Sequence, residues 1–254
     1  MKIRLHPLTG LLISALLLSL LWPVQASSQT SRWDSLSTSL GFTTIDPGLS
    51  SNPVRAIPDA NDPDNVIELE DTVQDRGSST RPSLTLTWRL QVFDGNWSVE
   101  TVLGPPFRFS FEFTGGNDLS NEIAGKLGET DMLPPVLMLV YNFPLSTAVR
   151  PYLGAGGSYL YSFNSELTAE ETAEGDLDIE NVATWLIQAG ANIDLDWLGW
   201  SENLFLNLDV KYIDSVRPMA TISDLESQGT TIDRTEVRLK LEPWAFSAGL
   251  GWRF

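Results

Sequence analysis

Eleven residues near the end of the chain, Trp244 to Phe254, read Trp-Ala-Phe-Ser-Ala-Gly-Leu-Gly-Trp-Arg-Phe. Every second residue is apolar and most of these are bulky, whereas the residues between them are small or polar. Alternation with a period of two predicts a β-strand with one apolar face. A single strand of this kind is not stable alone, so partner strands are expected elsewhere in the chain.

The same alternation recurs upstream, and the chain is predicted to contain eight strands. In one stretch, Trp97, Val99, Thr101 and Leu103 share their parity with four later phenylalanines, Phe107, Phe109, Phe111 and Phe113. Pro105 and Pro106 interrupt that stretch, which indicates a bend or bulge. The eight stretches are Trp33–Ile45, Leu84–Val92, Trp97–Phe113, Leu137–Phe143, Leu153–Phe163, Trp185–Leu195, Leu204–Ile213 and Trp244–Phe254.

The connections between these stretches alternate in length. Short ones fall at Asp94–Asn96, Pro144–Ala148 and Asp196–Asn203, and long polar ones fall at Pro47–Thr80, Thr114–Asp131, Asn164–Asn181 and Asp214–Thr235. Tight turns at one end and long loops at the other are typical of an all-β, up-and-down, antiparallel transmembrane β-barrel. The prediction has short periplasmic turns, long extracellular loops and both termini in the periplasm.

A soluble eight-stranded barrel of the lipocalin type is the alternative architecture. Such a barrel carries its bulky apolar residues inside and its charges outside. Here the face opposite the bulky residues is small or polar, which suits the narrow lumen of an eight-stranded barrel. The bulky face is therefore predicted to contact lipid, with aromatic residues near the strand ends at the two membrane interfaces. These aromatic residues are Trp97, Tyr161, Tyr212 and Phe254.

The first residues have the organisation of a secretory signal peptide. Lys2 and Arg4 precede an apolar run from Leu11 to Leu21, and Val24-Gln25-Ala26 offers small residues for cleavage after Ala26. An uncleaved membrane anchor is the alternative, but this run is shorter than the roughly 20 apolar residues that span a bilayer. Residues 1–26 are predicted to be removed, which leaves a single barrel domain over residues 27–254.

The composition excludes several kinds of site. The chain has no Cys, and its one His, His6, lies in the predicted signal peptide. Disulfides, Ser-His-Asp triads and His-ligated zinc are therefore excluded from the mature protein, and no enzyme activity or cofactor is expected. The net charge is −17, and loss of the two cations Lys2 and Arg4 makes it −19. Such a charge argues against a nucleic-acid partner.

A set of short motifs resembles the OmpW family of small outer-membrane barrels. They occur in the order of that family, from about Trp88 to the end of the chain. The motifs are Asn96-Trp97-Ser98-Val99-Glu100, Pro106-Phe107-Arg108, Leu133-Pro134-Pro135, Arg150-Pro151-Tyr152-Leu153-Gly154-Ala155-Gly156, Asp209-Val210-Lys211-Tyr212-Ile213-Asp214 and Glu242-Pro243-Trp244 with Gly251-Trp252-Arg253-Phe254.

The resemblance implies passive passage of small hydrophobic molecules, such as alkanes or aromatic compounds, across the outer membrane of a Gram-negative bacterium. It also implies a lumen closed toward the periplasm and a sideways exit into the bilayer. Colicin reception and stress responses are associated with some members. The chain departs from the pattern in its long acidic first loop, Pro47 to Thr80, and at Asp131-Met132.

Several apolar residues share a parity with the small and polar face and are candidates for a ligand route. Together they would line a dry pocket for an apolar solute, and the alternative is that they fill a narrow core. They are Val136, Met138, Val140, Leu160, Leu186, Phe205 and Ile213. Pro134 and Pro135 join them, because a break in the ladder there could open the wall, although the start of a strand explains them better.

Charged residues on the inward parity are predicted to pair and to plug the periplasmic half of the lumen, rather than to select polar solutes. They are Arg89, Glu100, Asp209, Lys211 and Arg253. The acidic loop from Glu166 to Glu180 lacks the spacing of a calcium-binding loop, as does the segment Asp59–Asp64. A solvated loop is favoured over a metal site in both places.

The sequence thus predicts an outer-membrane channel for small hydrophobic molecules. The alternative is a non-transporting structural or adhesion barrel whose loops bind a partner. The expected partners are outer-membrane lipid and lipopolysaccharide, small hydrophobic solutes, and the barrel-insertion machinery, which would read the last strand through Phe254.

Overall fold

A computed structural model of the chain describes residues 36–52, 55–57, 64, 66–68, 72–75, 77–91, 95–114, 127–145, 148–168, 176–227 and 230–254. The predicted signal peptide, residues 59–63 and residues 169–175 of the two acidic segments lie outside the described residues, so the predictions for them stay untested. No described helix has the length and apolar character needed to cross a membrane.

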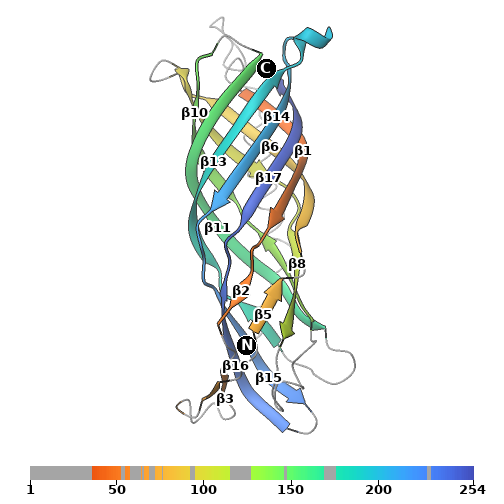
Figure 1. Cartoon of the computed structure of the whole chain (residues 1–254), viewed down its shortest axis with the longest axis vertical. Helices are drawn as coiled ribbons and strands as arrows, with labels where there is room; N and C mark the ends of the chain where they lie inside the picture. Colours follow the sequence, from red (N-terminus) through yellow and green to blue (C-terminus); the bar gives the residue numbers. More distant parts are fainter. Residues whose placement is uncertain are drawn as a thin grey trace, which may run out of the picture. The chain divides into compact units, whose positions relative to one another are not determined.

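Eight strands pair antiparallel in a closed ring (Figure 1). The ring closes because β11 pairs with β13 on one side and with β10 on the other. This confirms the predicted eight-stranded barrel. In the order of the ring the strands are β10 (Val136–Asn142), β7 (Trp97–Leu103), β6 (Ser79–Arg89), β1 (Leu36–Asp46), β17 (Trp244–Arg253), β14 (Leu204–Ile213), β13 (Val182–Asp194) and β11 (Val149–Thr168).

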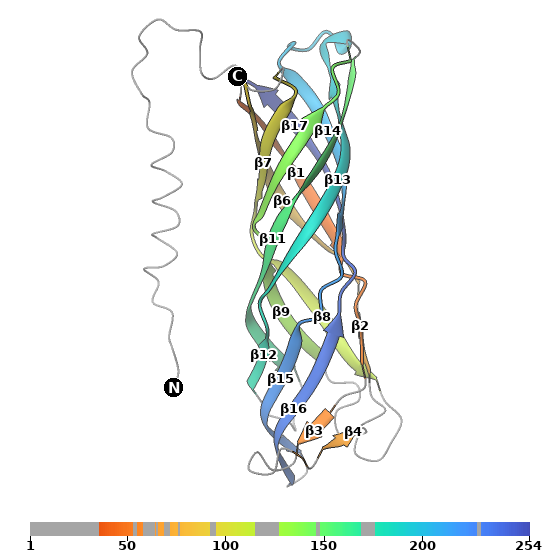
Figure 2. The same cartoon turned by 90° about the vertical axis from the view of Figure 1, so that its left-hand side faces the viewer.

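Beyond the ring, on the side away from the short turns, the sheet continues as an extension (Figure 2). One part joins the far half of β11 to β9 (Leu127–Leu133), β8 (Phe107–Thr114) and β5 (Thr72–Asp75). The other part contains β12 (Asp176–Ile179), β15 (Met219–Ser227), β16 (Thr230–Lys240), β3 (Arg55–Ile57) and β4 (Ile67–Glu68), with β2 (Ser50–Ser51) beside β16.

The extension corrects the prediction of long loops. The predicted loop Asp214–Thr235 is largely a hairpin of β15 and β16, and strands also enter the other three predicted loops. These segments also alternate, but their apolar residues face inward and their charged residues face outward. Ala220, Ile222, Val237 and Leu239 are buried inside the extension, while charged side chains such as Arg238 point outward. A strand that faces water on its outer side reads as polar, which is why the sequence suggested loops.

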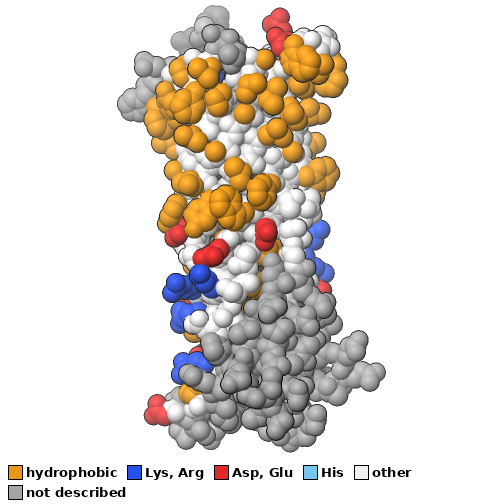
Figure 3. Space-filling view, in the orientation of Figure 1, with side chains coloured by type: hydrophobic (Ala, Val, Ile, Leu, Met, Phe, Trp, Pro, Cys, Tyr) orange, Lys and Arg blue, Asp and Glu red, His pale blue; other side chains and the backbone are white. Residues whose placement is uncertain are grey.

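Alternation runs without interruption from β16 into β17 and marks the edge of the membrane. Odd-numbered residues face inward along both strands. The outward residues change from Arg238, Lys240 and Glu242 to Trp244 and Phe246. Figure 3 shows the result on one face, where apolar side chains cover the ring and charged side chains begin below it. The change in outward chemistry between Glu242 and Trp244 places the boundary of the lipid-facing band there.

Aromatic contacts lie at both edges of this band. At the short-turn edge, the ring centroids of Trp97 and Tyr141 are 5.1 Å apart. At the other edge, the Tyr212 ring contacts Trp244 at 5.1 Å and Trp185 at 6.3 Å. Between the two edges, most outward-facing side chains are apolar and exposed. Leu40, for example, is 67% exposed. Two such girdles are typical of membrane barrels.

The phenylalanines of β8 correct a second prediction. Phe107, Phe109 and Phe111 are buried, although their parity with Trp97 predicted an outward position; the side chain of Phe113 is not described. Val102 is opposite Val136, but Phe107 is opposite Met132, so four residues of one strand face three of the other. One extra residue at Leu103–Pro106 reverses the alternation that follows, as a β-bulge does.

The lipid-facing band predicts a site-specific cost for charge. We expect Leu208→Arg, in the middle of the outward row of β14, to lower the free energy of unfolding by about 2–4 kcal/mol, because a cation is poorly solvated in hydrocarbon. Thr221→Arg, on the outward row of β15 and opposite Glu236 in the register, is the matched control and should cost little. Equilibrium unfolding in lipid vesicles measures both, and equal losses would contradict the assigned band.

Candidate functional site

The lumen at the short-turn half of the barrel is filled by polar side chains. The carboxylate of Glu100 on β7 accepts a hydrogen bond from Gln188 Nε2 at 3.1 Å and from Thr87 Oγ1 at 3.4 Å. On β14, the Lys211 ammonium contacts the Asp209 carboxylate, and both side chains are almost completely buried. Because a buried charge needs a partner, these groups form a network that fills the lumen rather than a set of free ions.

Tyr152 extends the polar network toward the short turns. Asn207 donates from Nδ2 to the Tyr152 hydroxyl at 2.8 Å and to Asn192 Oδ1 at 2.9 Å. The Tyr152 ring lies against Gly190, in the space that a Cβ would otherwise occupy. A side chain at position 190 would therefore displace the ring, so the glycine makes room for this part of the plug.

A further ionic layer lies at the end of the lumen. The Asp194 carboxylate contacts Arg253 at 2.7 Å and Arg150 at 2.6 Å. The Arg253 guanidinium also lies 4.4 Å above the Phe205 ring, which itself packs onto Gly251. The polar fill therefore continues to the short-turn end of the barrel.

The charged residues predicted for the lumen thus have different surroundings. Glu100, Asp209 and Lys211 lie deep in the barrel, Arg253 lies at its end, and Arg89 is exposed there. The prediction missed their partners, which are Gln188, Tyr152, Asn207, Asp194 and Arg150. Inward parity would have found all five, since each alternates with lipid-facing residues.

Apolar side chains line the lumen beside the polar network, where Met138 is opposite Glu100 in the register, and continue toward the extension. Five of the residues predicted for the ligand route form one buried cluster with Tyr152: Val136, Met138, Val140, Leu186 and Ile213. Leu160 belongs to a separate cluster with Val216 and Leu241. Phe205 lies apart from both, at the short-turn end. A third cluster, which the sequence did not predict, joins Ile45, Phe107, Phe109, Met132 and Ala245.

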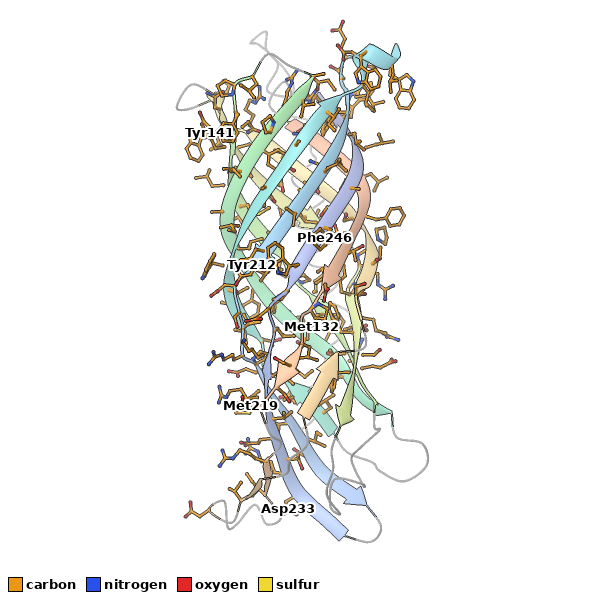
Figure 4. The ribbon with its side chains drawn as sticks, in the orientation of Figure 1. Met132, Tyr141, Tyr212, Met219, Asp233 and Phe246 are labelled. Carbon is orange, nitrogen blue, oxygen red and sulfur yellow. The ribbon has the colours of Figure 1, made fainter. Side chains whose placement is uncertain are left out.

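A small pocket opens among these apolar side chains in the extension. Figure 4 labels Met132, one of its lining residues, beyond the level of Tyr212. About 20 Å³ of it is open to a water-sized molecule, and its exposed surface is entirely apolar. The lining residues are Pro47, Leu49, Phe109, Ser110, Phe111, Thr130, Met132, Ile179, Leu239 and Leu241.

The wall of the barrel is interrupted next to the third cluster. The ladder between β6 and β7 ends at the pair Leu84–Leu103, and among the described strands none pairs with residues 79–83 of β6 on that side. The ladder between β7–β8 and β9–β10 is also interrupted, at Leu103–Pro106 opposite Leu133–Pro135. Prolines lack the N–H donor that a ladder needs. Pro134 and Pro135 nevertheless stay in register with β11, so the discontinuity lies on the β8 side.

An ion pair lies outside the band, beside this interruption. Arg108 donates from Nε and Nη2 to the two carboxylate oxygens of Asp131, at 3.0 and 3.2 Å. The hydrogen bonds from Arg108 hold the pKa of Asp131 below its ordinary value of 3.8, while partial burial acts in the opposite direction. In the described part of the chain, no group of three acidic residues is arranged to hold a metal ion.

The whole ring and extension match a known family of sequences. The profile of the OmpW family matches residues 40–254. The chain belongs to the OmpW family. It is therefore a non-enzymatic β-barrel of the outer membrane of a Gram-negative bacterium.

Individual relatives agree with this assignment. Outer membrane protein W of Vibrio cholerae is 29% identical over 178 residues, which cover 70% of this chain and 75% of that protein. Dibenzothiophene metabolism operon protein PahQ of Pseudomonas aeruginosa is 29% identical over 135 residues, 53% of this chain and 56% of that protein. The crystal structure of OprG from Pseudomonas aeruginosa superposes with a TM-score of 0.70 at 23% identity, covering 90% of this chain and 99% of OprG, and supports the fold.

The buried pair on β14 gives a testable consequence. We expect Lys211→Met to lower the free energy of unfolding by about 3–5 kcal/mol, because it leaves the Asp209 carboxylate buried without its cation. The double variant Lys211→Met with Asp209→Leu should regain most of this loss. Chemical unfolding in detergent micelles measures both, and a double variant as unstable as the single one would argue against the pairing.

The ion pair outside the band predicts a dependence on pH. Because the pKa of Asp131 is lower in the folded state, its contribution to stability is present above the ordinary value and is lost as the pH falls through the folded value. Wild type should therefore exceed Asp131→Asn in unfolding free energy at neutral pH, and the difference should shrink as the pH falls below 3.8, the ordinary pKa of the carboxyl. A pH-independent difference would exclude ionisation of Asp131 as its cause.

Proposed function

We propose that this barrel passes small, uncharged, apolar solutes from outside the cell into the outer membrane. The solute would enter through the extension and contact the apolar side chains of the lumen next to it. It would then leave through the interrupted wall into the bilayer. The observation that carries this proposal is the change along the lumen, from the apolar clusters around Phe107 and Leu160 next to the extension to a network of polar and charged side chains in the short-turn half.

The two halves of the lumen suit different solutes. A water-filled pore for polar solutes would need an open polar lumen, but here charged and amide side chains contact one another across it and occupy most of the space. An apolar solute would gain from leaving water at the clustered apolar side chains. It would have no comparable gain in crossing the ionic layer of Arg253 and Asp194. A sideways exit avoids that layer.

One relative supports the class of solute. The name of PahQ associates that protein with a dibenzothiophene metabolism operon. Dibenzothiophene is an uncharged, flat, polycyclic aromatic compound, which is the chemistry that an apolar lining favours. We infer a solute of the same general class, aromatic or aliphatic, for this chain.

A second candidate function is a structural or adhesion barrel that transports nothing and binds a partner through its extension. It is favoured by the pocket, whose open space of about 20 Å³ is too small for an aromatic ring unless side chains move.

We further infer two partners for either function. These are lipopolysaccharide around the outward charged rows such as Arg238 and Lys240, and the barrel-insertion machinery at the strand that ends in Phe254.

Uptake of labelled naphthalene by cells with intact outer membranes tests the first candidate. Cells that contain the protein should take up naphthalene faster than cells that lack it, with no difference for a labelled sugar. Leu241→Gln, which places an amide in the pocket lining, should slow naphthalene uptake. Phe205→Leu, at the short-turn end of the lumen, should leave it unchanged because the proposed route does not reach it.

Three results would count against this route. No difference for naphthalene with and without the protein would favour the adhesion barrel. Equal acceleration for the sugar would indicate an aqueous pore. A larger effect of Phe205→Leu than of Leu241→Gln would indicate passage along the whole lumen instead of through the wall.

A further inference from the structure

The interruption in the wall is crossed by one arginine side chain. Arg81 on β6 donates from Nε to the carbonyl oxygen of Pro106, at 3.1 Å. We propose that Arg81 is a latch that holds β6 against the segment Gly104–Pro106 and thereby controls the passage of apolar solutes through the wall. This inference rests on the proposed function and assigns a role to a residue that the sequence did not single out.

Backbone pairing does not hold this part of the wall together. The ladder from β6 ends at the pair Leu84–Leu103, and β1 is the one described strand that pairs with residues 79–83. Pro82, Pro105 and Pro106 have no N–H to donate, so a ladder cannot extend through them. The side chain of Arg81 therefore supplies a hydrogen bond where the backbone supplies none.

Close contact of the two backbones accompanies the latch. A Cβ built on Gly104 would lie 2.8 Å from the Pro82 carbonyl oxygen and 3.7 Å from the Ser83 Cα. A contact of 2.8 Å with backbone is too short for any side chain, so β6 and the segment could not approach so closely with another residue at position 104. The glycine thus permits the closed arrangement, and Arg81 stabilises it.

The surroundings of Arg81 fit a gate for apolar solutes. Directly inside the interruption lie Phe107 and Met132 of the third cluster, both buried. On the outside, Leu133 is exposed on the lipid-facing side. A solute that moved between these two environments would meet a cation with a fixed hydrogen bond. Since an apolar solute cannot replace that bond, passage requires Arg81 to release Pro106.

An acidic partner outside the wall helps to keep Arg81 in place. The Arg81 charge is close enough to favour the ionised form of Asp131, whose two oxygens already accept hydrogen bonds from Arg108. Arg81 is therefore attracted toward the interruption by a carboxylate that it does not bind directly. Its half-buried position limits competition by water for the Pro106 carbonyl.

Removal of the latch tests the proposal in the full-length protein. Arg81→Met keeps the length of the side chain but removes the donor and the charge, and it should raise the rate of naphthalene uptake roughly fivefold, the change expected when an opening equilibrium loses one hydrogen bond. Gly104→Val, whose side chain would wedge the backbones apart, should act in the same direction. Arg89→Met, an exposed arginine at the short-turn end of the same strand β6, is the matched control and should match wild type.

Hydrogen exchange at the amides of Leu103 and Gly104, measured by NMR in lipid nanodiscs, gives a readout that does not depend on transport. Exchange should become faster in Arg81→Met, while the amides of β13 and β17 keep their protection and show that the barrel is folded. Unchanged exchange in a folded Arg81→Met barrel would overturn the latch. So would faster exchange without faster uptake, because the segment would then open without admitting solute.

Comparison with cells that lack the protein separates this proposal from the proposed function. If wild type gives no uptake above those cells but Arg81→Met does, the natural transport role fails and the latch is supported. If neither gives uptake, both fail. If wild type transports and the two variants equal it, the proposed function survives and the latch is overturned.

Discussion

A backbone N–H or C=O group inside a bilayer has no water to bind and must find its partner within the protein. The ring of eight strands meets this requirement by closing β11 onto β10, so that each described strand of the ring has a neighbour on both sides within the lipid-facing band. The rest of the structure depends on this closure. The interruptions at Pro82, Gly104–Pro106 and Pro134–Pro135 lie at the edge of the band, where the outward residues change from apolar to charged, and not in its middle.

The barrel contacts lipid along one part and water along the other, because the alternating rows carry different kinds of side chain in the two parts. Within the band the outer row is apolar and the inner row is small or polar, as in Trp244–Arg253. In the extension the outer row is charged and the inner row is apolar, as in Val237 and Leu239 of β16. The barrel is therefore a membrane protein at one end and resembles a water-soluble barrel at the other. Two apolar clusters of the lumen, around Phe107 and around Leu160, lie where this exchange takes place, which is why a route for apolar solutes is best supported there.

Much of this arrangement was predictable from the sequence. Strong alternation over Trp185–Leu195, Leu204–Ile213 and Trp244–Phe254 predicted the strands, the lipid-facing side and the ring, and the motif order predicted the family. Inward parity also predicted that Val136, Met138, Val140, Leu186 and Ile213 face the lumen, where they form one cluster. Parity gives the side on which a residue lies but not its height in the barrel, so Phe205 was grouped with residues far from it.

The remaining errors have a common physical cause. The sequence predicts a loop over β15 and β16 because strands with a charged outer row look polar when their sequence is averaged. The direction of Phe107, Phe109 and Phe111 was wrong because parity holds only along an uninterrupted ladder. Arg81 gave no signal at all, since its role depends on a carbonyl that lies 25 residues away in the chain.

The extra residue between Leu103 and Phe107 restricts which insertions and deletions the protein can accept there. In general, surface loops can gain or lose residues at little cost. A deletion of one residue at this bulge would instead exchange the two faces of β8. Three phenylalanine rings would turn toward water and the guanidinium of Arg108 would turn into the apolar interior. The segment Leu103–Pro106 should therefore tolerate the loss or gain of two residues better than that of one, because a change of two leaves each side chain of β8 on its present face.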